Sequence, residues 1–260
     1  KVLEAVYVNY QGNKECEDFI AMTIYLKRIW FSNGIYHHYG SEKFAPEFSP
    51  AFLLDAMKSI EPSLLPLAKG ETVDGLFDRL KSAIFDPSFL PKKVNKADGC
   101  DLVATSACNF YHKVSQHEVE DYYSSLKATV DKNPPSFGLN SRLVKLNGEL
   151  IEQVWKIDGM YSKAIEIIVS YLRQAAEYAE NEQQQKIISL LISYYQTGDL
   201  RVFDKYSIEW LKEQDGRIDF INGFIEVYND PLGLKASWEG IVEYKDLVAT
   251  RRTRTISDNA

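Results

Sequence analysis

The stretch NGFIEVYNDPLG, residues 222–233, followed by SWEG at residues 237–240, decides the fold of the C-terminal part of the chain. Its β-branched and aromatic residues predict two strands that are joined by a Pro- and Gly-containing turn. If the middle of the stretch is extended, Glu226 and Tyr228 project from one face about 7 Å apart, with Phe224 in line. A carboxylate and a phenol would then face one cleft, although a solvent-facing pair on a strand edge is the simpler interpretation.

Upstream of this stretch, apolar residues recur at three- and four-residue spacing, which predicts amphipathic helices. Ser49-Pro50 and the capping box of Ser115 and Glu118 mark two helix starts. Tyr122 is expected on the buried side of the second of these helices. Asn147-Gly148 between two β-prone runs predicts a hairpin, because both turn residues need positive φ. The predicted elements are helices over 14–30, 49–60, 72–85 and 115–129, a hairpin over 142–156, three packed helices within 162–211, and two strands beyond residue 216.

The composition is that of an ordinary globular protein, with 45% hydrophobic and 26% charged residues. No apolar run approaches the ~20 residues that span a bilayer, so no membrane partner is expected. The net charge of −7 disfavours nucleic acid as a partner and suits a cationic ligand. Cys16, Cys100 and Cys108 are odd in number and widely spaced, which argues against a disulfide framework. Unpaired thiols predict a cytoplasmic protein, and the bacterial periplasm is the open alternative.

The four histidines do not form a helical metal-binding motif. His117-Glu118 begins such a motif, but Asp121 stands where the second histidine is needed. Helix capping is therefore the preferred interpretation of this pair. His37-His38 are adjacent and, if extended, point to opposite sides, which favours packing of a loop over metal binding. Nucleophilic and nucleotide chemistry have no support, since GxSxG and glycine-rich phosphate loops are both missing.

The chain begins with Lys1, and its last residues, 251–260, have no apolar periodicity. We expect residues 1–260 to form a single lobe of a chain that continues beyond residue 260. Residues 246–260 are expected to start a linker that leads onward.

GFIEVYNDPLG followed by WEG is similar to the segment Gly-Phe-Ile-Glu-x-Tyr-x-Asp-Pro-x-Gly, then Glu-Gly, of the dipeptidyl peptidase III family, zinc metallopeptidase family M49. The stretches RIWFSNGIYHHY, PPSFGLNSRLV and IDGMYSKAIEIIV look like the bacterial members, so the resemblance spans nearly the whole chain. The GFIExYxDP string carries the most weight, because it has far more fixed positions than a lone glycine motif. The resemblance is to the N-terminal, substrate-binding lobe of a two-lobed peptidase. It implies an α+β fold: a predominantly helical lobe around a small antiparallel β core.

Members of this family are zinc peptidases that release dipeptides from the N-termini of short peptides. Carried over by position, Glu226 would bind the free ammonium group of the peptide, and Glu239 would assist that contact. Tyr228 would be catalytic, donating a hydrogen bond to the scissile carbonyl as its oxygen becomes negative. Phe224, in line with these two side chains, is included among the substrate-binding residues.

The zinc-binding string of the family, HExxGH, does not occur in residues 1–260. The resemblance therefore implies zinc in the full-length enzyme, with ligands in a catalytic lobe outside this chain, and no metal on the chain itself. The expected partners are short peptides with a free N-terminus and that catalytic lobe of the same polypeptide, and the chain alone is expected to be inactive. The alternatives are a noncatalytic peptide-binding or interaction protein derived from the same fold, and a purely structural helical module.

Overall fold

A computed structural model of the chain describes residues 1–130 and 132–260. The chain divides into two compact units, Lys1–Ala107 and Cys108–Ala260. The single lobe over residues 1–260 stays a prediction.

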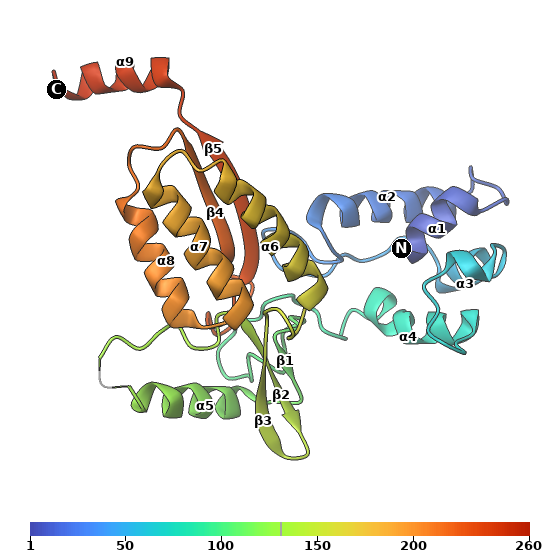
Figure 1. Cartoon of the computed structure of the whole chain (residues 1–260). Coiled ribbons are helices and arrows are strands. Elements are labelled where there is room, and N and C mark those ends of the chain that lie inside the picture. The colour runs from blue at the N-terminus through green and yellow to red at the C-terminus, as the bar shows by residue number, and fades with distance from the viewer. Residues whose placement is uncertain (131) are drawn as a thin grey trace. The chain divides into compact units, whose positions relative to one another are not determined.

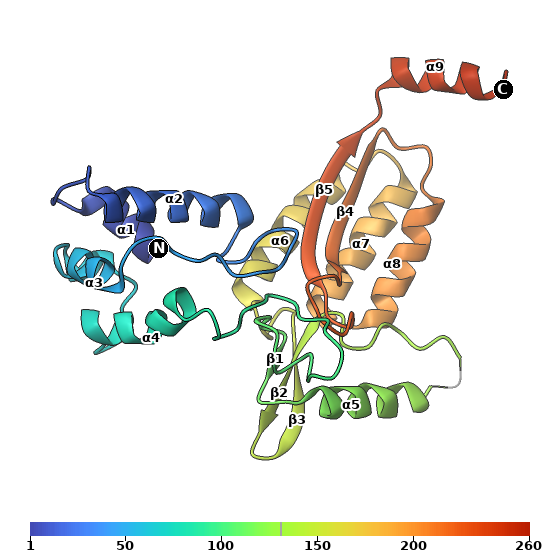
Figure 2. The same cartoon turned by 180° about the vertical axis from the view of Figure 1, so that it is seen from behind.

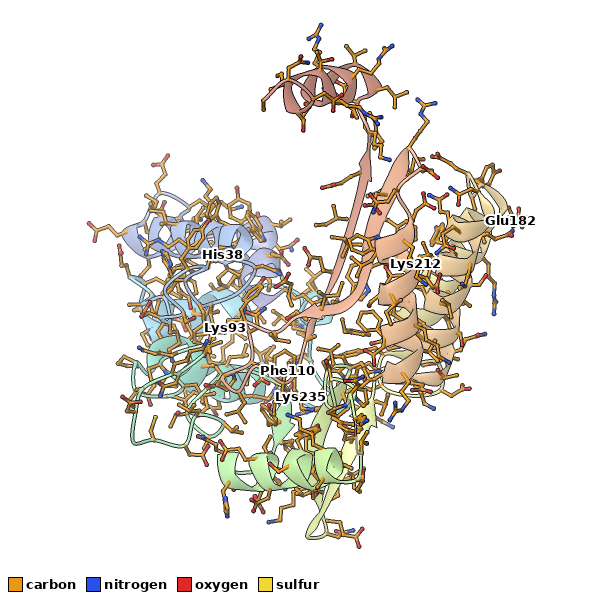
Figure 3. All side chains as sticks on the ribbon, turned by 90° about the vertical axis from the view of Figure 1, so that its left-hand side faces the viewer. His38, Lys93, Phe110, Glu182, Lys212 and Lys235 are labelled. Carbon is orange, nitrogen blue, oxygen red and sulfur yellow. The ribbon has the colours of Figure 1, made fainter. Side chains whose placement is uncertain are left out.

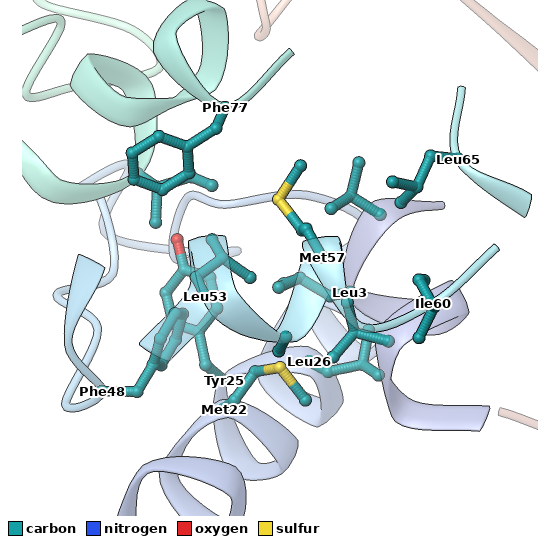
Figure 4. Packing of buried hydrophobic residues seen from close by; sticks show 14 of the residues in the cluster. Leu3, Met22, Tyr25, Leu26, Phe48, Leu53, Met57, Ile60, Leu65 and Phe77 are labelled. Carbon is teal, nitrogen blue, oxygen red and sulfur yellow. The ribbon is translucent and has the colours of Figure 1, made fainter. Parts of the chain in front are cut away.

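The unit Lys1–Ala107 is built from helices. Its core joins Met22 and Leu26 of α2 to Leu53 and Met57 of α3 and to Phe77 of α4 (Figure 4). These apolar side chains come from one stripe of each helix, so burying the stripes holds the unit together. The helices are α1 (Val2–Asn9), α2 (Glu17–Ser32), α3 (Pro50–Lys58), the 3₁₀-helix η1 (Pro62–Leu64) and α4 (Val73–Phe85).

Local signals predicted α2, α3 and α4 of this unit, whereas α1 and η1 were not predicted. The Ser49 side chain accepts a hydrogen bond from the backbone N–H of Phe52 at 3.1 Å, and Pro50 occupies the first position of α3. Thr72 caps α4 in the same way. Asn33, in the predicted Asn-Gly turn, has φ 53° and ends α2 in the left-handed region.

The unit Cys108–Ala260 contains all the named strands of the described residues. Its elements are β1 (Tyr111–His112), α5 (Gln116–Ala128), β2 (Ser141–Leu146), β3 (Glu149–Val154), α6 (Ser162–Glu177), α7 (Glu182–Thr197), α8 (Leu200–Lys212), β4 (Ile218–Glu226), β5 (Ser237–Tyr244) and α9 (Leu247–Ser257). The strands β2 and β3 form the predicted antiparallel hairpin, and β1 adds a short parallel pairing to β2. Asn147 and Gly148 have φ of 51° and 89°, as the turn requires.

The second sheet is the antiparallel pair β4 and β5. Figures 1 and 2 show α6, α7 and α8 together on one face of this pair, whereas the opposite face carries no described helix of the same unit. Gly198, with φ 71°, ends α7, and the Asp199 side chain caps α8. The α+β fold, with its predominance of helices and small sheets, is thus confirmed.

Two expectations about local structure were wrong. In α5 the buried residues are Val119 and Tyr123 rather than Tyr122, because the Tyr123 hydroxyl finds partners on β3 and in the β4–β5 connection. The chain also does not close with two strands: α9 follows, capped by Asp246, and none of its residues is buried. The linker predicted over residues 246–260 stays a prediction. No helix in the described part of the chain is both long and apolar enough to cross a membrane.

The capping box of α5 generates a testable prediction about acid stability. Glu118 accepts a hydrogen bond from Lys145 and two from Ser115, and these contacts lower the pKa of Glu118 to about 2. Because this pKa lies below its unfolded value, the stabilisation is present above about pH 4.5 and is lost as the pH falls towards 2. We expect Glu118→Gln to lower the free energy of unfolding near neutral pH and to have little effect near pH 2, as measured by urea denaturation.

Glu120→Gln, on the same helix with an exposed side chain, is the matched control. An equal effect of Glu118→Gln at both pH values would contradict the assigned cause.

Candidate functional site

The pairing of β4 with β5 determines where the predicted site residues point. Gly223 lies opposite Glu239 and Phe224 opposite Trp238, but the next pair is Glu226 with Ser237, so Ile225 is an extra residue in β4. Such a β-bulge breaks the alternation of side chains.

The bulge moves Glu226 to the other face of the sheet. Residues that lie opposite each other in an antiparallel pair share a face, as do residues two apart along one strand. Ser237 and Glu239 therefore share a face, and Glu226 joins them there. Phe224 lies on the other face with Trp238, so the expectation that Phe224 is in line with Glu226 was wrong.

Glu226 and Glu239 form a carboxyl pair on the face of the sheet opposite to that of Phe224. Both side chains are half-buried. The pKa of Glu239 is raised, first by its partial burial, then by the negative charge of Glu226 and by a side-chain hydrogen bond between the two. A cation placed beside the pair would relieve this repulsion, so the pair is suited to binding an ammonium group.

Tyr228 lies outside the strand. β4 ends at Glu226, and Tyr228 belongs to the turn that the hydrogen bond from Asp230 N–H to the carbonyl of Val227 closes at 3.0 Å. The expectation of an extended chain through Tyr228 was therefore wrong. With 62% of its surface exposed, the Tyr228 side chain is free to meet a ligand.

Phe224 is only 6% exposed and packs on the helical side of the sheet. Its ring centroid lies 4.8 Å from that of Trp155 and 6.3 Å from that of Tyr195. Together with Trp155 and Trp238, Phe224 lines a cavity of about 330 Å³. The structure therefore brings Glu226 and Glu239 together and leaves Phe224 apart from them.

Two functional candidates were missed in the sequence, and both lie in the connection between β4 and β5, residues 227–236. The first is Asp230, which is 1% exposed. Its carboxylate accepts hydrogen bonds from the backbone N–H groups of Leu234 and Lys235 and from the hydroxyl of Tyr111, each at 2.8 Å. The charge of Asp230 is thus satisfied inside the protein.

The second is Lys235, which is fully buried in the interior of the unit (Figure 3). Its amine donates to the hydroxyl of Tyr123, to Ser141 Oγ at 3.1 Å and to the carbonyl of Gly138 at 3.2 Å. Three acceptors match the three N–H groups of an ammonium. Glu152 Oε1 lies 3.9 Å away and accepts hydrogen bonds from the Tyr123 and Ser141 hydroxyls.

A sequence signal existed for only one of these two residues. An Asp that precedes Pro and a nearby Gly is typical of a turn in which backbone N–H groups of the turn donate hydrogen bonds to the carboxylate. No local pattern distinguishes Lys235 from an exposed lysine, because its partners lie far away in the sequence.

Two of the histidines interact with residues near them in the sequence. His117 is exposed and makes an ion pair with Asp121 at 3.2 Å. His37 Nδ1 accepts hydrogen bonds from the backbone N–H groups of Tyr39 and Gly40, which is a role in loop structure. Across residues 1–130 and 132–260, no three His, Cys, Asp or Glu side chains gather into a group that could hold a metal ion. A zinc ion therefore does not fit these residues, and we derive no chemical step through one.

Comparisons with known proteins agree on one family. The model of Peptidase family M49 matches residues 105–260. Dipeptidyl peptidase 3 of Dictyostelium discoideum is 21% identical over 256 residues, which cover 94% of this chain and 36% of the relative. Dipeptidyl peptidase 3 of Mus musculus is 24% identical over 257 residues, which cover 87% of this chain and 33% of the relative. The chain thus spans about a third of the length of these curated relatives.

A solved structure supports the fold. The structure of DPP III from Caldithrix abyssi superposes with a TM-score of 0.56 at 16% identity, and the match covers 98% of this chain and 39% of that one.

The buried lysine generates a prediction about pH. Burial lowers the pKa of Lys235 to about 8, while the charges of Glu152 and Asp230 act in the opposite direction. Between about pH 8 and 10.5 the unfolded chain binds more protons at this residue than the folded protein, so folding becomes more favourable as the pH rises. Lys235→Met removes this linkage. We expect the free energy of unfolding of the wild type to rise relative to that of K235M between about pH 7.5 and 9.5, as measured by urea denaturation.

Lys58→Met removes a lysine at the surface and serves as the control. A difference between wild type and K235M that stays constant or falls over this range would contradict the prediction.

Proposed function

The chain belongs to peptidase family M49, and from this premise we propose that its residues form the substrate-binding part of a zinc-dependent dipeptidyl peptidase that releases dipeptides from the N-termini of short peptides. The relatives named dipeptidyl peptidase 3 support the reaction, and their greater length supports a further, catalytic lobe on the same polypeptide. Zinc would be held by that lobe and would supply the Lewis acid of the hydrolysis. Residues 1–260 alone would be inactive.

The carboxyl pair of Glu226 and Glu239 is the observation that carries this proposal. A peptidase that releases dipeptides must cleave at a fixed distance from the charged amine of its substrate, and a half-buried anionic pair provides a fixed point that binds this amine. Glu226 would accept hydrogen bonds from the ammonium group, and Glu239 would share its charge. Burial strengthens both interactions, because the local dielectric is lower than in water.

Tyr228 follows Glu226 by two residues, on an exposed turn. In the proposed complex its hydroxyl donates a hydrogen bond to the oxygen of the scissile carbonyl, which becomes negative as the bond breaks. The amine would thus be anchored by the end of the strand and the carbonyl by the turn that follows it. A contact between Phe224 and the substrate stays a prediction, and the ring's position supports a role beneath the strand.

The role of Tyr228 is tested by Tyr228→Phe in the complete protein. Loss of one donor to the carbonyl oxygen is expected to lower kcat about a hundredfold, which corresponds to about 2.7 kcal/mol. Release of dipeptides from a dipeptidyl-naphthylamide, together with metal analysis of the complete protein, measures this. An unchanged kcat would remove the catalytic assignment. A complete protein that binds peptides without zinc and without hydrolysis would instead favour the noncatalytic alternative.

The role of Glu226 is tested by Glu226→Ala. We expect KM for a peptide substrate to rise at least about tenfold, because a charge-assisted hydrogen bond to the ammonium group is lost. Glu243→Ala is the matched control, since Glu243 is an exposed acid further along β5 on the same face of the sheet. The two variants should differ, and N-acetylated peptides should be poor substrates of the wild type. Equal KM values for both variants would argue against the proposed ammonium site.

A further inference from the structure

The turn that carries Tyr228 is part of a longer connection, residues 227–236, that leaves β4 and returns to β5. A second turn, from Gly233 N–H to the carbonyl of Asp230 at 3.1 Å, follows the first. Tyr228 itself is exposed, so packing of its own ring does not determine its position. Whatever holds the rest of the connection therefore also positions the phenol.

The connection is attached to the other sheet of the same unit at both of its charged residues. Asp230 accepts the hydrogen bond from Tyr111 on β1, and Lys235 donates to Tyr123 on α5 and to Ser141 on β2. The Lys235 amine also lies 4.7 Å from the centroid of the Tyr123 ring, within the range of a cation–π interaction. In addition, the backbone N–H of Ala236 donates to the carbonyl of Leu139 at 2.9 Å.

The fold alone does not require charges at these two positions. Burying an ion is costly, and replacing a buried ion pair by apolar residues of similar volume is often neutral or stabilising. The charges instead make the position of the connection specific, because each charged group is fully hydrogen-bonded in only one arrangement of its donors or acceptors. The position of a catalytic group must be held within about 0.5 Å, and an error of about 1 Å can reduce the rate about a hundredfold.

We propose that Asp230 and Lys235, held by Tyr111 and Tyr123, are positioning residues that dock the β4–β5 connection on the β1–β3 sheet and α5 and thereby hold Tyr228 in its reactive position. This inference rests on the proposed function. None of the four side chains touches substrate; each acts through the connection. Glu226 lies in the paired strand before the connection, so the docking affects the carbonyl contact and leaves the ammonium contact in place.

The test is a double-mutant cycle between Tyr111→Phe and Tyr228→Phe in the complete protein, with dipeptide release from a dipeptidyl-naphthylamide as the readout. Tyr111→Phe removes only the hydroxyl that donates to Asp230. In the wild-type background it is expected to lower kcat about tenfold and to change KM less than about twofold. In the Tyr228→Phe background it is expected to change kcat less than about twofold, since the group it positions is already gone.

The control is Tyr25→Phe, which removes a buried hydroxyl that has no hydrogen-bond partner among the described residues. It should leave kcat unchanged. Far-UV circular dichroism and the midpoint of thermal unfolding report whether each variant is folded.

Lys235→Met provides a second, independent variant. The Tyr123 and Ser141 hydroxyls keep Glu152 as their acceptor, at 2.6 and 2.5 Å, so the substitution leaves neither hydroxyl unpaired. The same pattern is expected, with a lower kcat in the wild-type background and little further loss beside Tyr228→Phe.

The outcomes separate the two proposals. Suppose that Tyr228→Phe lowers kcat, and that Tyr111→Phe and Lys235→Met lower kcat by the same factor in the Tyr228→Phe background as in the wild type. The positioning role is then overturned while the proposed function stands. If either variant leaves kcat unchanged in the wild-type background, its positioning role is likewise overturned. If Tyr228→Phe itself leaves kcat unchanged, the proposed catalytic role fails, and the positioning role fails with it.

Discussion

The one-residue mismatch between β4 and β5 at Ile225 is the constraint on which the rest of the site depends. In a regular antiparallel pair, Glu226 would share the helix-covered face with Phe224, where an unpaired carboxylate is expensive to bury. The bulge places Glu226 beside Glu239 on the other face and leaves Phe224 to pack against Trp155 and Tyr195. A single extra residue thus separates the face of the hairpin that carries the carboxyl pair from its core face.

The candidate site residues come from the strands β4 and β5 and from the connection between them. The strands β4 and β5 supply the acidic pair, in which partial burial and then the charge of Glu226 raise the pKa of Glu239. The connection supplies an exposed phenol, and it is attached to the β1–β3 sheet and α5 through Asp230 and Lys235. The proposed anchor for a charged amine and the proposed donor for a carbonyl oxygen therefore depend on different parts of the same unit.

The buried Asp230 and Lys235 illustrate how polar groups can be accommodated in a protein interior. Each is satisfied by several partners, which include backbone N–H groups for Asp230 and two hydroxyls and a carbonyl for Lys235. Such networks contribute little net stability, but they define one geometry. Such a network can fix the position of the β4–β5 connection, whose exposed residue Tyr228 is not held by packing of its own ring.

Signals within a few residues of one another determined most of the secondary structure. The caps at Ser49 and Ser115 and the Asn147-Gly148 turn were readable because their hydrogen bonds and dihedral angles are local. Through the family resemblance, the strings GFIEVYNDPLG and WEG also suggested Glu226, Tyr228 and Glu239 as site residues. The buried side of α5, the bulge and the docking of the connection were decided only by tertiary structure, since Tyr111 and Asp230 are separated by 119 positions and Tyr123 and Lys235 by 112. No local pattern records a partner at that distance, because the contact forms only after the sheets and α5 have packed.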